Sequence, residues 1–388
     1  MRTAKIVAVD DITFQLDKVP FSLPVAALIA LLSFHRQRQI LGPQLRFLDH
    51  VRSTRWLKWF LTFVVIKSAN RFLGRMARNN GYYAADPPRW SRVKGKGDVV
   101  LITGGSTGIG KEVVELLVKQ TNKIVVFDMA EPTYNAASGV HFFKVDITDP
   151  EAIAVAAQKV RAEVGHPTII LAVAELLTTI LPVQVNNAGI IHVAPLLKAT
   201  PASMKKVFAV NVMGAHNILR EFLPHLIAIN HGHVLTTASS AAYASVCEFA
   251  AYSCSKAAVL ALHETTQAEL FHRYKAPKVR VSIICPTKVA TTLGEFLEDK
   301  SLQFLFPTIS PKWLADKMTT TIESGLSEHL VLPHYASLLP GLRFFPEWFR
   351  WVFENAGSVH SMTSEARTAN TSSKIYTFAK TNFDDRTE

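Results

Sequence analysis

Cysteine is scarce in this 388-residue sequence, and the three cysteines present, Cys247, Cys254 and Cys285, cannot form a disulfide framework. Their spacing is not that of a zinc site, and His231 and His233 lie close together without a third ligand, so no metal is expected. Charged residues are also few, at 19%, while 48% are hydrophobic, which excludes a disordered or collagen-like chain. The sequence therefore indicates a globular protein in a reducing, cytosol-facing compartment.

Acidic residues are nearly missing from one part of the chain. Residues 35–96 contain 14 Lys and Arg side chains but only Asp49 and Asp86, whereas residues 98–388 contain 25 basic and 26 acidic side chains. The formal charge of +11 therefore belongs to one N-terminal segment. Because the main body is nearly neutral, we expect no nucleic acid among the partners of this chain.

The longest uncharged apolar run near the N-terminus, residues 19–34, is shorter than the roughly 20 residues that a straight membrane-spanning helix needs. A second run, residues 56–66, contains Lys58. Together with the basic residues around them, these runs favour a membrane anchor, either a marginal span or a segment lying in the interface. The alternative is a buried helix of a soluble domain. Arg-rich flanks would keep the following chain on the cytosolic side.

The residue pattern changes after the dipeptide Pro87-Pro88, which we interpret as a break between domains. Residues 1–97 are predicted to form the membrane-associating region. Residues 98–333 are predicted to form a single catalytic α/β domain, and residues 334–388 a C-terminal aromatic segment with a polar tail.

A glycine-rich turn joins the first expected strand of the α/β domain, residues 98–103, to a helix. Glycines let the backbone turn tightly and approach a pyrophosphate, which binds at the positive N-terminus of the helix. The turn reads Thr103-Gly104-x-x-x-Gly108-x-Gly110 and resembles the cofactor motif of the short-chain dehydrogenase/reductase family. The resemblance implies a Rossmann-type doubly wound parallel sheet and a set of cofactor-binding residues: Thr103, Gly104, Ser106, Gly108, Ile109 and Gly110.

The second expected strand ends in Asp128, eighteen residues after Gly110. A carboxylate at this place accepts hydrogen bonds from the adenosine ribose hydroxyls and repels the 2′-phosphate of NADP. We therefore expect NAD as the cofactor, with NADP less favoured; the alternative is an aspartate that starts a turn. Asp146 follows the strand 140–145 and either matches the family's adenine-contacting acid or caps a turn.

A strand-ending serine, Ser239, is followed thirteen residues later by Tyr252 and then by Lys256. Tyr and Lys four residues apart share one face of a helix. A free tyrosine, with a pKa of about 10, is a poor base at neutral pH, and a neighbouring ammonium stabilises its phenolate. We predict that Tyr252 transfers the hydroxyl proton, that Lys256 supports it and holds the nicotinamide ribose, and that Ser239 orients the substrate oxygen.

The pattern Tyr-x-x-x-Lys occurs three times in the chain. The pair at 274 and 278 encloses Pro277, which breaks the helix that the pair requires, and the pair at 376 and 380 lies in the polar tail. Tyr243, nearby in the sequence, has Cys247 where lysine is needed. Tyr252 is therefore the predicted catalytic tyrosine.

The family resemblance implies three further site residues. Asn187 lies in Asn-Asn-Ala-Gly, a motif that in the family stabilises the central sheet and lines the cofactor cleft. Asn211 matches the family's helix asparagine, which holds a water in the proton relay, and Thr291 matches the threonine that contacts the nicotinamide amide. The family commonly has glycine after the proline that here is Pro286, and this chain has Thr287 instead.

One segment departs from the family pattern. The strand that begins at Pro167 is expected to run straight into Asn-Asn-Ala-Gly, but about fourteen mostly apolar residues, 171–184, intervene. Surface loops are normally polar, so this segment is unusual. Two interpretations stay open: a helical insertion, or intron sequence translated in a faulty gene assignment, which we favour.

These features together predict an oxidoreductase that transfers a hydride between NAD(H) and the alcohol or carbonyl group of a lipophilic substrate. The anchor and the motifs resemble the subgroup that contains 17β-hydroxysteroid and retinol dehydrogenases. The resemblance implies a steroid, retinoid or long-chain lipid as substrate. It also implies attachment to the endoplasmic reticulum or a lipid droplet, with a homodimer among the expected assemblies. The alternative from another class is a non-catalytic nucleotide-binding scaffold at the same surface.

Overall fold

The computed structural model describes residues 55–81, 98–120, 123–132, 134, 139–172, 196–245, 248–290 and 308–356. The chain divides into two compact units, residues 1–84 and 85–388.

The first unit contributes the helix α4 (Arg55–Arg78). Trp59, Phe63 and Ile66 are exposed on it, and its last turn contains Arg75 and Arg78. Among the residues that the structure describes, no helix combines the length and the apolar character needed to cross a membrane. The apolar run 19–34, on which the predicted anchor depends, lies outside the described residues.

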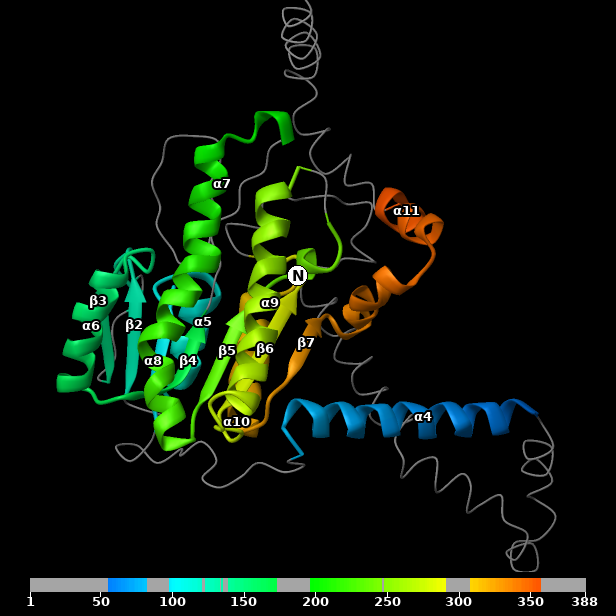
Figure 1. Ribbon diagram of the computed structural model, residues 1–388, viewed down its shortest axis with the longest axis horizontal. Coiled ribbons are helices and arrows are strands. Elements are labelled where there is room, and N and C mark those ends of the chain that lie inside the picture. The colour runs from blue at the N-terminus through cyan, green and yellow to red at the C-terminus, as the bar shows by residue number, and fades with distance from the viewer. Residues whose placement is uncertain are drawn as a thin grey trace, which may run out of the picture. The chain divides into compact units, whose positions relative to one another are not determined.

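Seven parallel strands form one sheet in the second unit, in the order β3-β2-β1-β4-β5-β6-β7 (Figure 1). The strands are β1 (Val99–Thr103), β2 (Ile124–Asp128), β3 (Val140–Lys144), β4 (Pro167–Ala172), β5 (His233–Thr237), β6 (Arg280–Pro286) and β7 (His329–Leu332). The strand β1 is buried at every position because helices cover both faces of the sheet, which explains its continuous apolar sequence. The predicted parallel α/β sheet is confirmed.

Helices pack on both faces of this sheet (Figure 1). One face is covered by α5 (Gly108–Leu117) and α10 (Pro311–Ser324), and the other by α6 (Pro150–Glu163), α8 (Ala215–Ile229) and α9 (Ala250–His272). On the first face, Val113 of α5 and Met318 of α10 belong to one buried cluster with Val100 and Ile102 of β1. This three-layer packing holds the strand ends in fixed positions.

The strand order reverses between β1 and β4. The chain runs outward from β1 through β2 to β3, then returns to β4 on the other side of β1, where Thr103 lies beside Ala172. In an open parallel sheet, ligands bind in the crevice at the carboxyl ends of the strands where this reversal occurs. The expected site therefore lies beyond Thr103 and Ala172.

Strand β4 also bears on the predicted insertion. Leu171 and Ala172, the first two residues of the segment 171–184, continue β4 in register with β1 and are buried. Residues 173–184 lie outside the described residues, as do residues 185–195. Both interpretations of the insertion stay predictions.

The C-terminal aromatic segment begins with a 3-10 helix, η7 (His334–Phe344), followed by α11 (Glu347–Ala356). Leu339 and Leu342 of η7 pack into a buried cluster with Ile283 and Val331, so the start of this segment belongs to the domain core. Further along, Phe344 is 93% exposed and Trp348 is 67% exposed, so the segment also presents aromatic rings at the surface.

Candidate active site

The glycine turn after β1 adopts backbone angles that suit glycine. Gly104 and Gly108 have φ values of 68° and 57°, in the left-handed region. A Cβ atom on Gly110 would lie only 2.1 Å from the carbonyl oxygen of Gly104, so helix α5 begins in close contact with the turn. This close approach directs the helix N-terminus at the crevice, and these residues fit the pyrophosphate of a dinucleotide.

Asp128 lies at the end of β2, as predicted, and is almost completely buried. Its Oδ2 accepts a hydrogen bond from the Ser106 amide at 3.0 Å, and its Oδ1 accepts one from the Ala130 amide at 3.1 Å. Burial raises the pKa of the Asp128 carboxyl above its usual value, and the amides of Ala130 and Ser106 oppose that rise. Asp128 therefore anchors the glycine turn in addition to its predicted contact with ribose.

Asp146 lies in an exposed turn after β3. Its Oδ1 accepts hydrogen bonds from the amide of Thr148 at 2.9 Å and from the Thr148 hydroxyl at 2.8 Å. These bonds are those of a turn-starting aspartate, which was one of the two expectations. The adenine contact of Asp146 stays a prediction.

Ser239 follows the carboxyl end of β5 by two residues and begins the short 3-10 helix η5 (Ser240–Ala242). Its Oγ accepts a hydrogen bond from the Ala241 amide at 3.2 Å. A hydroxyl that accepts one such bond still carries a proton to donate. Ser239 can therefore donate a hydrogen bond to an oxygen at this edge of the sheet.

Tyr252 and Lys256 lie in the first part of α9, four residues apart as predicted. Lys256 is fully buried, and its Nζ donates a hydrogen bond to the Thr237 carbonyl at 3.3 Å. The same Nζ lies 5.5 Å from the centroid of the Tyr252 ring. A buried ammonium is costly unless nearby groups use its charge, so this arrangement favours stabilisation of a negative charge on Tyr252.

Asn211 lies in a π-helical segment, η4 (Ala209–Gly214), between α7 (Pro201–Phe208) and α8. Its Nδ2 donates to the Ser255 Oγ at 3.0 Å, and this hydroxyl donates to the Tyr252 carbonyl at 2.8 Å. π-Helical turns inside longer helices are frequent at functional sites. The sequence did not identify Ser255, although it lies inside the Tyr-Ser-Cys-Ser-Lys motif.

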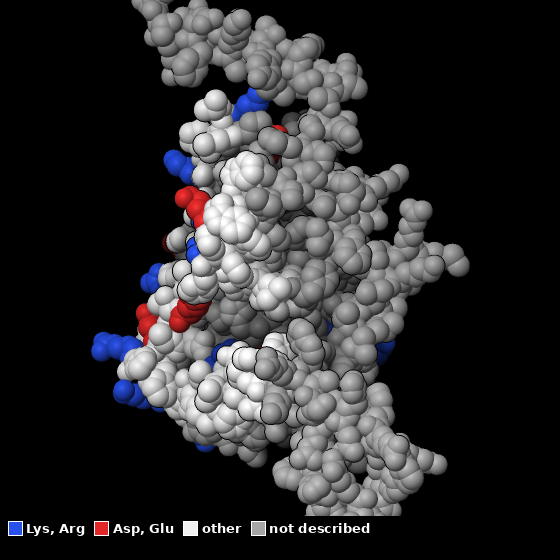
Figure 2. All heavy atoms as spheres, turned by 90° about the vertical axis from the view of Figure 1, so that its right-hand side faces the viewer, with Lys and Arg blue, Asp and Glu red and all other residues white. Residues whose placement is uncertain are grey.

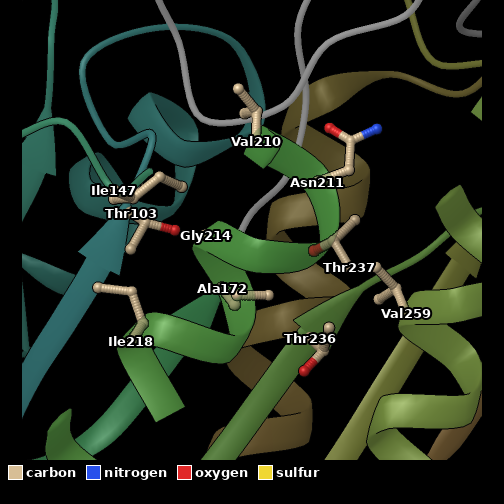
Figure 3. Close-up of a pocket in the computed structure, with 11 residues that line it drawn as sticks. Thr103, Ile147, Ala172, Val210, Asn211, Gly214, Ile218, Thr236, Thr237 and Val259 are labelled. Atoms are coloured by element: carbon tan, nitrogen blue, oxygen red, sulfur yellow. The ribbon is translucent and has the colours of Figure 1, made fainter. Parts of the chain in front are cut away.

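A small cavity opens among the ends of β1, β4, β5 and the η4 segment (Figure 3). Thr103 and Asn211 both line it, so two residues predicted from different motifs converge there. Thr237 also lines it, and among the described residues no group hydrogen-bonds to the buried Thr237 Oγ1. The cavity therefore has a polar wall at the strand ends.

The sequence did not reveal a partly buried polar cluster beside Ser239, made of Tyr243, Cys285 and His329. The hydroxyl of Tyr243, set aside as a catalytic candidate, contacts His329 Nε2 and lies 3.6 Å from Cys285 Sγ. Burial raises the pKa of Cys285 to about 11, although the Tyr243 hydrogen bond, the Lys256 charge and the Ser239 amide each oppose the rise. The cluster supports the turn that carries Ser239.

Two predicted site residues, Asn187 and Thr291, lie outside the described residues and stay predictions. Among the described residues, no group of three or more His, Cys, Asp and Glu side chains is arranged to hold a metal ion. His231 lies 3.4 Å from Asp98, and His233 lies 2.8 Å from the Ser282 hydroxyl.

Comparison with known proteins gives concordant matches. Residues 98–301 match the family described as short chain dehydrogenase. Dehydrogenase RED2 of Cochliobolus heterostrophus is 32% identical over 58% of this chain and 78% of its own length. Human estradiol 17-beta-dehydrogenase 11 is 32% identical over 68% of this chain and 84% of its own length. A 3-ketoacyl-(acyl-carrier-protein) reductase of Brucella melitensis, complexed with NADH, shares the fold with a TM-score of 0.50, at 19% identity, over 61% of this chain and 96% of that chain.

Proposed function

This chain belongs to the short chain dehydrogenase family, and we propose that it oxidises or reduces a lipophilic alcohol–carbonyl pair with NAD(H), using Tyr252 as its proton-transfer residue. The chain is an oxidoreductase that acts on hydroxyl and carbonyl groups with NAD(P), as the sequence predicted. The choice of NAD, the lipophilic substrate and the roles of individual residues are the proposed part.

The observation that carries the proposal is the position of Lys256. Its Nζ is fully buried between the Thr237 carbonyl, at 3.3 Å, and the ring of Tyr252. A positive charge held there stabilises the phenolate, so Tyr252 can accept the hydroxyl proton during oxidation and return it during reduction. Ser239, at the end of the neighbouring strand β5, donates a hydrogen bond to the substrate oxygen.

NAD, when bound, accepts or supplies the hydride. The residues that would hold its pyrophosphate are those of the glycine turn, where Gly104, Gly108 and Gly110 bring the backbone close to the helix N-terminus. Asp128 would contact the adenosine ribose, because it lies at the end of β2 beside this turn. Its carboxylate disfavours a phosphate at the same place, which supports NAD over NADP.

The lipophilic substrate and the membrane or droplet surface are supported by exposed apolar residues. In η7 and α11 the exposed aromatic residues include Phe344, Phe345 and Trp348. Figure 2 turns the right-hand side of Figure 1 toward the viewer, and uncharged residues (white) predominate among the described atoms on this face. The helix α4 presents Trp59 and Phe63 in the same way. The two tryptophans, each with one indole N–H on an apolar ring, suit the boundary between lipid and water, and the phenylalanines add apolar area.

The name of the human relative, an estradiol 17-beta-dehydrogenase, supports a steroid among the candidate substrates. We therefore propose attachment to the endoplasmic reticulum or to lipid droplets, with the catalytic domain facing the cytosol. Retinoids and long-chain alcohols belong to the same chemical class and are included in the test.

The test is the reduction of NAD, followed by absorbance, with purified full-length protein and a panel of estradiol, retinol, a long-chain alcohol and ethanol. We expect turnover with at least one lipophilic alcohol and little with ethanol. A protein that binds NADH but turns over no member of the panel would contradict the proposed activity and favour a nucleotide-binding scaffold.

A further inference from the structure

The peptide unit between Gly105 and Ser106 is held at both of its ends. The hydroxyl of Tyr134 donates a hydrogen bond to the Gly105 carbonyl at 3.0 Å, and the Ser106 amide donates to Asp128 Oδ2 at 3.0 Å. The carbonyl and the amide belong to one planar peptide, so they point in opposite directions. Tyr134 and Asp128 therefore fix the orientation of this peptide between them.

This peptide needs such support because residue 105 is glycine. A Cβ atom at position 105 would lie 2.8 Å from Val126 Cγ1, so a larger residue here would displace the Val126 side chain of β2. Glycine, however, gives the backbone more rotational freedom than any other residue. Gly105 has no side chain that could restrain the backbone. The hydrogen bonds from Tyr134 and to Asp128, which lie outside the turn, restrain it instead.

Tyr134 is well suited to donate this hydrogen bond permanently. Its ring packs against the buried cluster that contains Val113 and Val126. Burial, together with the negative charges of Asp128 and Glu115, raises the pKa of the Tyr134 phenol to about 12. At neutral pH the phenol is therefore protonated and a donor.

The position of Tyr134 in the chain explains why sequence motifs do not reveal it. It lies in residues 129–139, which connect β2 to the edge strand β3. Connections between parallel strands usually take a dozen or more residues. In this short connection Tyr134 reaches the face of the sheet that α5 covers and contacts the glycine turn there.

We propose that Tyr134 is a positioning residue for the adenosine half of the cofactor and contributes to the choice between NAD and NADP. The proposal rests on the function proposed above. With the hydroxyl removed, the Gly105–Ser106 peptide can rotate, and Asp128 loses the amide that holds one of its oxygens. The carboxylate of Asp128 is then no longer held in one orientation. It therefore binds the ribose less well and discriminates less against a 2′-phosphate. Tyr134 touches no reacting atom, so the chemical step is unaffected.

The experiment compares the affinities for NADH and NADPH, measured by nicotinamide fluorescence, in the wild type, Tyr134→Phe and Tyr274→Phe. Tyr134→Phe keeps the packed ring and removes only the hydroxyl, and Tyr274 is a matched control that is 44% exposed. We expect Tyr134→Phe to weaken NADH binding about threefold to tenfold, the effect of one lost hydrogen bond, and NADPH binding by less. Tyr274→Phe is expected to match the wild type.

Kinetics separate positioning from a general structural role. For Tyr134→Phe we expect a raised KM for NAD with a kcat within about twofold of the wild type. Equal losses of kcat with both cofactors, accompanied by a lowered melting temperature, would overturn the proposal. A second measurement uses the double variant Tyr134→Phe with Asp128→Asn. Because both residues hold one peptide, their effects on NADH affinity are expected to be less than additive.

The outcomes distinguish this proposal from the function on which it depends. If the wild type binds NADH and Tyr134→Phe binds it equally well, the positioning role is wrong while the proposed activity stands. If the double variant shows strictly additive effects, the shared peptide is not what couples the two residues, and the proposal is again wrong. If the wild type binds neither NADH nor NADPH, both the positioning role of Tyr134 and the proposed activity are wrong.

Discussion

Asn211 and Ser255 join two helices that carry different parts of the site. The Asn211 Nδ2 donates to the Ser255 Oγ at 3.0 Å, which links the π-helical segment η4 to the first turns of α9. Both side chains are almost completely buried. Because Ser255 also donates to the Tyr252 carbonyl, the position of Asn211 is tied directly to the helix turn that carries the proposed proton-transfer residue.

Tyr252→Phe removes the phenolic hydroxyl and keeps the ring. We expect turnover to fall by at least about 100-fold, the low end for the loss of a general acid–base group. NADH affinity, measured by fluorescence, should stay within a few-fold of the wild type because the glycine turn is untouched. Normal turnover by this variant would show that another group transfers the proton.

Asp128→Ala tests the choice of cofactor. We expect the wild type to have the higher kcat/KM with NAD, and the variant to lose much of this preference because the charge that repels a 2′-phosphate is gone. Since Asp128 also holds the amides of Ser106 and Ala130, the variant should bind NAD more weakly as well. Equal use of NAD and NADP by the wild type would be incompatible with the NAD assignment.

Ser255→Ala removes the acceptor of Asn211 Nδ2 without changing any group proposed to react. We expect a loss of about 1 kcal/mol in the free energy of unfolding, measured in urea, together with a lower kcat. Cys254→Ala is the control, since Cys254 is exposed on the same helix. If both variants behaved alike, the link between η4 and α9 would have no influence on the site.

Stability should depend on pH through His233. Its imidazole is buried beside Arg280, and burial foremost lowers its pKa to about 3. An unfolded histidine has a pKa of about 6.5, so between these values the unfolded chain binds a proton that the folded chain does not. Stability is therefore complete above about pH 6.5 and falls as the pH is lowered toward 3, by up to about 1.4 kcal/mol per pH unit. His263, with its pKa lowered to about 4, acts in the same direction.

Urea unfolding at pH 7, 6 and 5 measures this slope. His233→Gln should make the free energy of unfolding depend less steeply on pH than it does in the wild type. A wild-type slope in His233→Gln would mean that other groups take up the proton.

Membrane attachment is tested by fractionation. Residues 19–34 supply apolar area and the basic stretch supplies attraction to anionic lipid, at about 1 kcal/mol per well-placed Lys or Arg. High salt weakens only the second contribution. We expect the full-length protein to stay in the membrane or droplet fraction after a salt wash and a deletion of residues 1–66 to become largely soluble. Release of the full-length chain by salt alone would contradict an inserted anchor.

Local sequence predicted the elements that depend on local chemistry. The strand β1, the glycine turn and the pair Tyr252 and Lys256 were all recognisable, because apolar runs, glycine spacing and helical periodicity are properties of neighbouring residues. Asp128 was found for the same reason, since it ends an apolar strand.

Tertiary packing determined the parts that the sequence did not reveal. The π-helical turn at Asn211 interrupts what reads as a continuous helical pattern. Tyr134 and Tyr243 acquire their roles only when the chain brings them beside Gly105 and His329. The hydrogen bond from the Ser106 amide to Asp128 likewise joins distant parts of the sequence, whereas the bond from the Ala130 amide is that of the turn-starting aspartate, which was the alternative expected from the sequence.

The strand β4 lies between β1 and β5, with Ala172 beside Thr103 on one side and Thr236 on the other. Ala172 is therefore the end of a central strand, and it lines the cavity. Strand β3 is at the edge of the sheet, but Ile147, three residues beyond its end, is buried and lines the same cavity. The ends of a central strand and of an edge strand therefore meet at one cavity, so a change of chain length beside either Ala172 or Ile147 would displace a residue of its wall.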